Sequence, residues 1–190
     1  MKIGLYFGSF NPIHIGHLII ASNILNTTDL EKIWFVVSPQ NPFKKSQTLL
    51  NEYQRLHLVR LATEDDTRLK AIDVEFKLNK PSYTIDTILY LKEKYPRFYF
   101  SIIMGSDSFV NIQKWKNHEK LIEENKILIY KRPGFEVTTK HLNVFVLNNT
   151  PLIEISATSI RELIRKRKSI RYLVSDKVME EIEKSGYFKK

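Results

Sequence analysis

Short apolar runs and amphipathic stretches alternate along the chain. Runs such as KIWFVVS, from Lys32 to Ser38, are rich in β-branched and aromatic side chains, which is typical of strands buried on both faces of a sheet. The runs expected to form strands are residues 3–7, 32–38, 69–74, 98–104, 127–130 and 144–147. Because helical patterns separate them, right-handed crossovers are expected. We therefore predict an α/β fold, a Rossmann-like open parallel sheet with helices on both faces.

Two of the expected helices have clear start or stop signals. One runs from Asn51 to Glu64, with Asn51 and Gln54 at the spacing of a capping box. The other starts at Pro81 to Thr84 and stops near Pro96. Its expected buried side chains are Ile85, Ile88 and Leu89.

The chain shows no internal repeat, low-complexity tract or linker. We expect a single domain over residues 1–190, with a C-terminal helical part at about 156–190. A domain of this length buries roughly 70% of its unfolded surface, which is enough for a full core. Whether the chain forms a homo-oligomer is left open.

The amino-acid composition excludes several kinds of site and segment. The absence of cysteine excludes disulfides, thiolate metal sites and cysteine nucleophiles together. No apolar run approaches the ~18 residues that a membrane span needs, and no signal-peptide pattern precedes the first strand. We therefore expect a cytoplasmic protein with no membrane partner.

The formal net charge of +9 implies anionic partners, and much of it falls between Arg161 and Arg171. Such a run is typical either of a nucleic-acid surface or of a solvated helix face. Because no stacking aromatic residues are interleaved with the basic ones, we expect no nucleic-acid partner.

The first strand leads into a helix through a loop that holds Gly8, Gly16 and two histidines. A helix that follows a glycine-containing turn presents free backbone N–H groups and the positive end of its dipole, where a phosphate binds. His14 and His17 lie within one turn of the helix start and can face the same anion. A single histidine here is more often a capping residue, but two that frame a glycine favour an anion site.

A second glycine turn, Gly105-Ser106-Asp107-Ser108, follows the strand at 98–104. In an open parallel sheet, ligands bind beyond the carboxyl ends of the strands, so this turn is expected beside the Gly8 turn. Trp115 follows in a polar stretch. It either stacks on a flat ring or is a partly buried core residue.

The segment EISATSIR opens a later helix. Ser159 and Glu162 have the spacing of a capping box, which explains both of them structurally. It does not explain Ser156, Thr158 and Arg161. Their hydroxyl and guanidinium groups at a helix N-terminus are expected to form a second anion site.

The first loop resembles the G-x-F-x-P-x-H-x-G-H signature of the nucleotidyltransferase superfamily, and its last four letters also match a motif of class I aminoacyl-tRNA synthetases. The chain is similar nearly end to end to the bacterial nicotinate-nucleotide adenylyltransferase family. The stretches that carry this are SPQNPFKK, PSYTIDT, GSDSF followed by KW, RPG, ISATSIR and YLVSDKVMEEIEKSGY. At Phe7 and Asn11 many members carry glycine and aspartate, so we expect an altered loop shape without loss of activity.

The resemblance implies a nucleotidyltransferase-type fold and a step of NAD biosynthesis. ATP and nicotinate mononucleotide would be joined to give nicotinate adenine dinucleotide and pyrophosphate, by in-line attack without a covalent intermediate. The attacking phosphate is largely ionised at neutral pH, so no general base is needed. Mg²⁺ would be held mainly by ATP phosphates and water, with no protein metal ligands.

The resemblance also assigns site residues. His14, His17 and Arg161 would be catalytic. The ATP site would comprise Gly8, Ser9, Phe10, Gly16, Gly105, Asp107, Ser156 and Thr158. The mononucleotide would contact Lys44, Thr84 and Trp115.

Two other functions fit the same pattern. One is adenylyl transfer to another acceptor such as phosphopantetheine, although that family has a threonine where His14 stands. The other, from a different class, is a tRNA-binding module related to class I synthetases. The chain is short for such a protein and has no KMSKS-like lysine loop.

Overall fold

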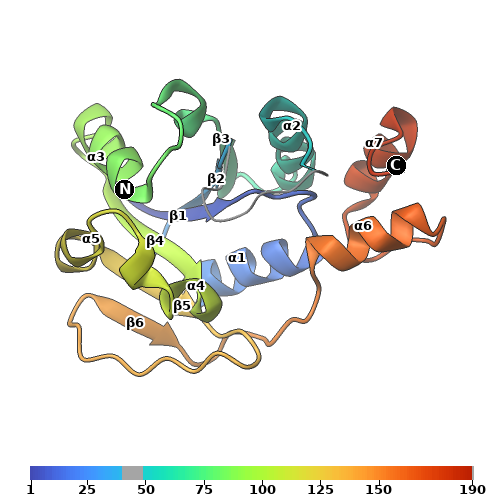
Figure 1. Cartoon of the computed structure of the whole chain (residues 1–190). Helices are drawn as coiled ribbons and strands as arrows, with labels where there is room; N and C mark the ends of the chain where they lie inside the picture. The colour runs from blue at the N-terminus through green and yellow to red at the C-terminus, as the bar shows by residue number, and fades with distance from the viewer. Residues whose placement is uncertain (40–48, 190) are drawn as a thin grey trace.

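The computed structural model describes residues 1–39 and 49–189, and a six-stranded sheet forms its centre (Figure 1). In chain order the strands are β1 Lys2–Gly8, β2 Lys32–Val37, β3 Leu69–Ile72, β4 Tyr99–Gly105, β5 Lys126–Tyr130 and β6 Val144–Leu147. Their order across the sheet is β3-β2-β1-β4-β5-β6, and every neighbouring pair is parallel. The predicted open parallel sheet is confirmed.

Helices lie on both sides of this sheet (Figure 1). The α-helices are α1 Ile15–Thr27, α2 Glu52–Thr63, α3 Thr84–Lys94, α4 Ser106–Phe109, α5 His118–Glu124, α6 Ala157–Arg165 and α7 Asp176–Ser185. Two 3₁₀ helices are η1 Val74–Lys77 and η2 Ile112–Lys114. The capping box predicted for α2 is present, since the Gln54 N–H donates to Asn51 Oδ1 at 2.9 Å and the Asn51 N–H to Gln54 Oε1 at 3.2 Å. Among the described residues, no helix is long and apolar enough to cross a membrane.

Two hydrophobic clusters cover the two faces of the sheet. One joins it to α1, α2, α6 and α7, and the other joins it to α3 and α5. Along β2, Ile33, Phe35 and Val37 belong to the first cluster, whereas Trp34 and Val36 belong to the second. This alternation explains the continuous apolar sequence of the strand, because both of its faces are buried.

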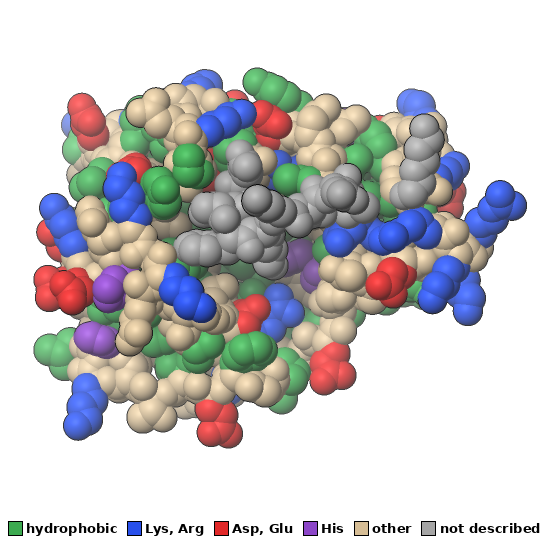
Figure 2. Space-filling view, viewed as in Figure 1, with side chains coloured by type: hydrophobic (Ala, Val, Ile, Leu, Met, Phe, Trp, Pro, Cys, Tyr) green, Lys and Arg blue, Asp and Glu red, His purple; other side chains and the backbone are tan. Residues whose placement is uncertain are grey.

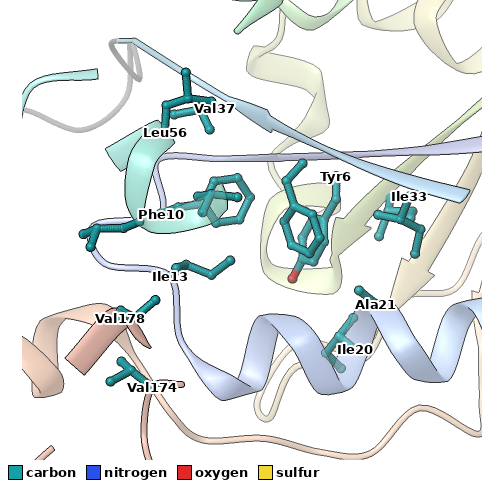
Figure 3. Packing of buried hydrophobic residues seen from close by; sticks show 14 of the residues in the cluster. Tyr6, Phe10, Ile13, Ile20, Ala21, Ile33, Val37, Leu56, Val174 and Val178 are labelled. Carbon is teal, nitrogen blue, oxygen red and sulfur yellow. The ribbon is translucent and has the colours of Figure 1, made fainter. Parts of the chain in front are cut away.

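Figure 3 shows part of the first cluster. Tyr6 from β1 and Phe10 from the loop after it lie side by side between the sheet and α1. Their rings meet edge to face, with centroids 5.9 Å apart. Leu56 of α2 and Val178 of α7 belong to the same cluster. The loop after β1 is therefore anchored in the core.

Two expectations about local structure were wrong. Leu89 of α3 is 46% exposed, whereas Ile88 and Leu91 are buried. Successive helical residues are rotated by about 100°, so a buried face centred between Ile88 and Leu91 leaves Leu89 on the solvent side. The strand expected over 69–74 ends at Ile72, and Val74 begins η1 instead.

The basic run forms an exposed surface. Lys and Arg side chains gather over α6, at the right of the view (Figure 2). Residues 165–168 are all exposed. They begin at the last residue of α6 and continue past its C-terminus, where cations interact favourably with the helix dipole.

Candidate active site

The site is at the point where the strand order reverses. β1 and β4 are neighbours in the sheet although three α-helices, one 3₁₀ helix and two strands separate them in sequence, and both strands end in glycine. A Cβ on Gly8 would lie 2.7 Å from the Phe10 ring, and a Cβ on Gly105 would collide with the Asp107 carboxylate. A side chain at position 8 would displace the buried Phe10 ring, so glycine lets this loop turn back over the end of β1, whereas the flexible Asp107 side chain could move aside. This is the crevice where open α/β sheets bind ligands.

Phe10 packs beneath the His17 ring and has an unusual backbone conformation. Its φ of 48° is in the left-handed region, which is uncommon for a residue with a bulky side chain. The ring is buried and meets the His17 ring edge to face, with centroids 5.1 Å apart. Strained backbone of this kind is often found where a loop must hold a functional geometry.

The structure brings the two predicted histidines together. His14 is the N-cap residue of α1, and its ring centroid lies 3.7 Å from that of His17. The backbone N–H of His14 donates to His17 Nδ1 at 3.2 Å. Because Nδ1 accepts this bond, the neutral His17 ring carries its proton on Nε2, and Nε2–H is a donor for a ligand.

Both histidines are neutral at neutral pH. Burial, together with the nearby Arg132 guanidinium, lowers the pKa of His14 to about 4. Burial lowers the pKa of His17 well below its usual value, and His14 and Arg132 lower it further. Within the described part of the chain, His14 Nδ1 is buried without a hydrogen-bond partner. The pair can therefore offer ring hydrogen bonds to an anion without a permanent charge of its own.

Arg161 joins the second predicted anion site to the first. Its Nη1 donates to the backbone carbonyl of Asn11 at 2.7 Å, and its Nη2 donates to Thr158 Oγ1 at 3.2 Å. Arg161 Nε is buried and has no partner among residues 1–39 and 49–189. The N-terminus of α6 thus adjoins the loop that carries the histidines. Figure 2 shows histidine side chains beside the basic side chains that gather over α6.

The capping box predicted for Ser159 and Glu162 was wrong. The helix begins three residues earlier, because the extended backbone of Ser156, with φ −125° and ψ 146°, makes it the N-cap residue. Ser156 Oγ accepts from the Ser159 N–H at 3.1 Å and donates to Ser159 Oγ at 3.0 Å. Ser156 is therefore a capping residue in this structure, one residue before the first turn of α6.

The sequence around Arg132 indicates only a turn, so the position of this residue in the site was not predicted. Its guanidinium lies 5.6 Å from the centroid of the Tyr130 ring, and its Nε lies 4.0 Å from Asp107 Oδ1. Arg132 lines one small pocket with both histidines, Tyr6 and Tyr130. The signal available in the sequence was the RPG stretch directly after the fifth apolar run.

Tyr6 and Tyr130 form the floor of this pocket. The Tyr6 hydroxyl donates to the Tyr130 hydroxyl at 3.0 Å, and burial raises the pKa of Tyr6. The Tyr6 ring also meets the His17 ring, with centroids 6.0 Å apart. The tyrosines come from β1 and β5, on either side of β4, so the pocket spans three strands.

The residues predicted to contact the mononucleotide lie on two linked segments. Thr84 is the first residue of α3, and Trp115 follows η2 and packs half-buried against the second cluster. Next to Trp115, Lys116 pairs with Asp86 of α3 at 2.8 Å and lies 5.0 Å from the Tyr83 ring. These contacts tie the Trp115 segment to the start of α3. Lys44 lies outside the described residues.

Comparison with known proteins identifies the family of this chain. Residues 5–163 match the cytidylyltransferase-like family. Two relatives carry the name "Probable nicotinate-nucleotide adenylyltransferase". The Flavobacterium psychrophilum protein is 47% identical over 100% of both chains, and the Cytophaga hutchinsonii protein is 49% identical over 99% of this chain and 98% of its own. The chain belongs to the nicotinate-nucleotide adenylyltransferase family.

Solved structures agree with the fold of this family. Plasmodium falciparum nicotinic acid mononucleotide adenylyltransferase complexed with NaAD superposes with a TM-score of 0.82 at 22% identity, covering 99% of this chain and 97% of that one. A Vibrio parahaemolyticus protein described as a "Putative Nicotinate-nucleotide Adenylyltransferase" gives a TM-score of 0.74 at 18% identity, covering 100% of this chain and 96% of that one. These superpositions confirm the predicted nucleotidyltransferase fold, and the 47% and 49% identical relatives confirm the predicted enzyme family.

Proposed function

We propose that this chain transfers the adenylyl group of ATP to nicotinate mononucleotide, giving nicotinate adenine dinucleotide and pyrophosphate. The observation that carries this proposal is the 2.7 Å hydrogen bond from Arg161 to the Asn11 carbonyl. It places the N-termini of α1 and α6 side by side. A triphosphate lying across both helix ends meets two sets of backbone N–H groups, two imidazoles and a guanidinium.

The chemical step needs little proton transfer. A phosphate oxygen of the mononucleotide attacks the α-phosphorus of ATP, the bond between this phosphorus and the bridging oxygen breaks, and the electron pair leaves with pyrophosphate. Because the second pKa of the attacking phosphate is about 6, it is largely ionised at neutral pH. The protein's tasks are to align attacker and leaving group and to stabilise the charge that develops.

His17 suits the α-phosphate, because its Nε2–H is free to donate while Nδ1 is held by the His14 N–H. Arg161 suits the departing pyrophosphate at the start of α6. Arg132 provides a second guanidinium from the end of β5, beside both imidazoles. Gly8, Gly105 and Phe10 would act by shaping the loops around these donors.

Nucleotidyltransferases in general use a divalent metal ion, and we propose Mg²⁺ for this chain. Residues 1–39 and 49–189 contain no group of three or more histidine, aspartate or glutamate side chains able to hold an ion. We propose that the ion arrives with the ATP phosphates and keeps several waters. When bound, Mg²⁺ would neutralise part of the phosphate charge.

On the acceptor side, Trp115 would stack on the pyridine ring, and Thr84 would donate from the first turn of α3. Support comes from the Lys116–Asp86 ion pair, which holds their segments together. Lys44 would complete this side of the site.

The test is pyrophosphate release from ATP and Mg²⁺ with nicotinate mononucleotide, nicotinamide mononucleotide or phosphopantetheine in turn. Release with nicotinate mononucleotide at the highest kcat/KM is expected. Faster release with phosphopantetheine, or a salt-dependent gel shift with tRNA and no release, would overturn the proposal.

A further inference from the structure

Arg55 of α2 is fully buried and has no ion-pair partner in the described part of the chain. Its guanidinium donates only to backbone carbonyls. Nη1 reaches Ser9 at 2.6 Å and Ser38 at 2.7 Å, Nη2 reaches Pro39 at 2.9 Å, and Nε reaches Leu50 at 2.9 Å. A buried charge is costly unless its hydrogen bonds are made, so these four contacts form a fixed unit.

The contacts of Arg55 join separate parts of the site. Ser9 belongs to the loop after β1, which carries the histidines. Ser38 and Pro39 follow β2, and Leu50 precedes α2. One planar guanidinium therefore sets the distance between the phosphate-binding loop and the end of β2. Because its donors have a fixed geometry, these two segments can shift little relative to each other.

Glu75 of η1 is a second buried charged residue, and it lies near the start of α3, on the proposed acceptor side of the site. The side chain is 2% exposed, and its carboxylate accepts from Ser82 Oγ at 2.8 Å and from Thr87 Oγ1 at 2.9 Å. η1 packs against β2, and the nearby Ser38 side chain partly offsets the rise in the pKa of the Glu75 carboxyl that burial causes. Ser38 thus lies between the two charged residues, since its carbonyl accepts from Arg55 and its side chain is near Glu75.

We propose that Arg55 and Glu75 are positioning residues that lie on either side of Ser38 and fix the phosphate-binding loop relative to the start of α3. This inference rests on the proposed function, in which Thr84, between Ser82 and Thr87, contacts the mononucleotide. Arg55 sets where the phosphates of ATP lie, and Glu75 sets where the acceptor lies. In-line attack depends on both positions at once, because small displacements of the reacting atoms cost rate steeply.

A merely structural role makes a different prediction. If Arg55 only stabilised the fold, its replacement would lower the melting temperature and leave kcat per folded molecule unchanged. A positioning residue changes kcat at saturating substrate, because each substrate still binds to its own side of the site while their alignment is lost.

The first experiment compares Arg55→Lys with Leu58→Ala. Lysine keeps the charge but cannot reproduce the planar fork, and Leu58 is a fully buried residue of the same helix that contacts none of the four carbonyls. Arg55→Lys is expected to lower kcat about tenfold or more, while calorimetric affinities for a non-hydrolysable ATP analogue and for nicotinate mononucleotide change less than about threefold. Leu58→Ala is expected to lose melting temperature and keep kcat.

An Arg55→Lys variant with parental kcat would overturn the positioning role of Arg55. If this variant does not fold, Glu75→Gln decides the inference, because glutamine has the same size and loses one acceptor oxygen. Glu75→Gln is expected to lower kcat several-fold, while the calorimetric affinities for both substrates change less than about threefold. A parental kcat in this variant would refute the role of the network.

The parent enzyme separates the two proposals. If it releases no pyrophosphate with nicotinate mononucleotide, the proposed function fails and this inference fails with it. If the parent is active and the variants match it, only the inference fails.

Discussion

The neutral state of His14 makes the stability of the fold depend on pH. Its pKa is about 4 in the folded protein and about 6.5 in an unfolded chain. Between these values the unfolded state binds more protons, so the free energy of unfolding rises with pH across this window and is lost as pH falls toward 4. A difference of about 2.5 pKa units at ~1.4 kcal/mol each gives roughly 3 kcal/mol for this one group.

The assay is urea unfolding between pH 4.5 and pH 7.5 for the parent and His14→Gln. Glutamine does not titrate, so the difference between the two curves isolates His14 from the carboxylates that also change in acid. The parent is expected to lose roughly 2.5 kcal/mol more than the variant between these two pH values. Parallel curves would refute a buried neutral His14. A loss confined to the region above pH 6.5 would show that the sign is wrong.

Three further predictions concern the proposed substrate contacts. His17→Ala is expected to lower kcat about a hundredfold or more while the fold stays intact, as circular dichroism will show, and near-normal kcat would refute its role. Arg161→Ala should raise the KM for ATP more than that for the mononucleotide, and Arg161→Lys should restore only part of it, as steady-state kinetics will show. Trp115→Ala should raise only the mononucleotide KM, at least several-fold, with partial recovery in Trp115→Phe; a collapsed melting temperature would mean that Trp115 is a core residue instead.

The sheet could be predicted because its information is local. Each strand is a short apolar run bounded by glycine, proline or polar residues, and a strand buried on both faces needs no partner to be recognised. The histidine loop was also local, since His14 and His17 are separated by a single helical turn. The end of β3 and the buried face of α3 were predicted wrongly. Both depend on which other elements pack against them, and this packing is not a local property of the sequence.

The contacts of Arg132 could not be predicted from its neighbours in sequence. Its position beside His14 and Asp107 requires β5 to lie next to β4 and β4 next to β1, and this order is a property of the whole sheet. A glycine and a proline around an arginine indicate only a turn. The sequence therefore predicted the loops that carry the site, and the strand order decided which side chains meet.

Arg55 shows why such residues gather at this edge of the sheet. In sequence Arg55 lies on the apolar face of α2, three and four residues before Leu58 and Val59, whereas its charge predicts an exposed position. At the carboxyl ends of parallel strands, however, the chain leaves the hydrogen-bonding ladder and carries carbonyl groups that no strand satisfies. Buried carbonyl groups need donors, and one guanidinium supplies several in a fixed plane. Because the same edge must hold substrates in a fixed relation, a donor that satisfies the loops also sets the geometry of the site.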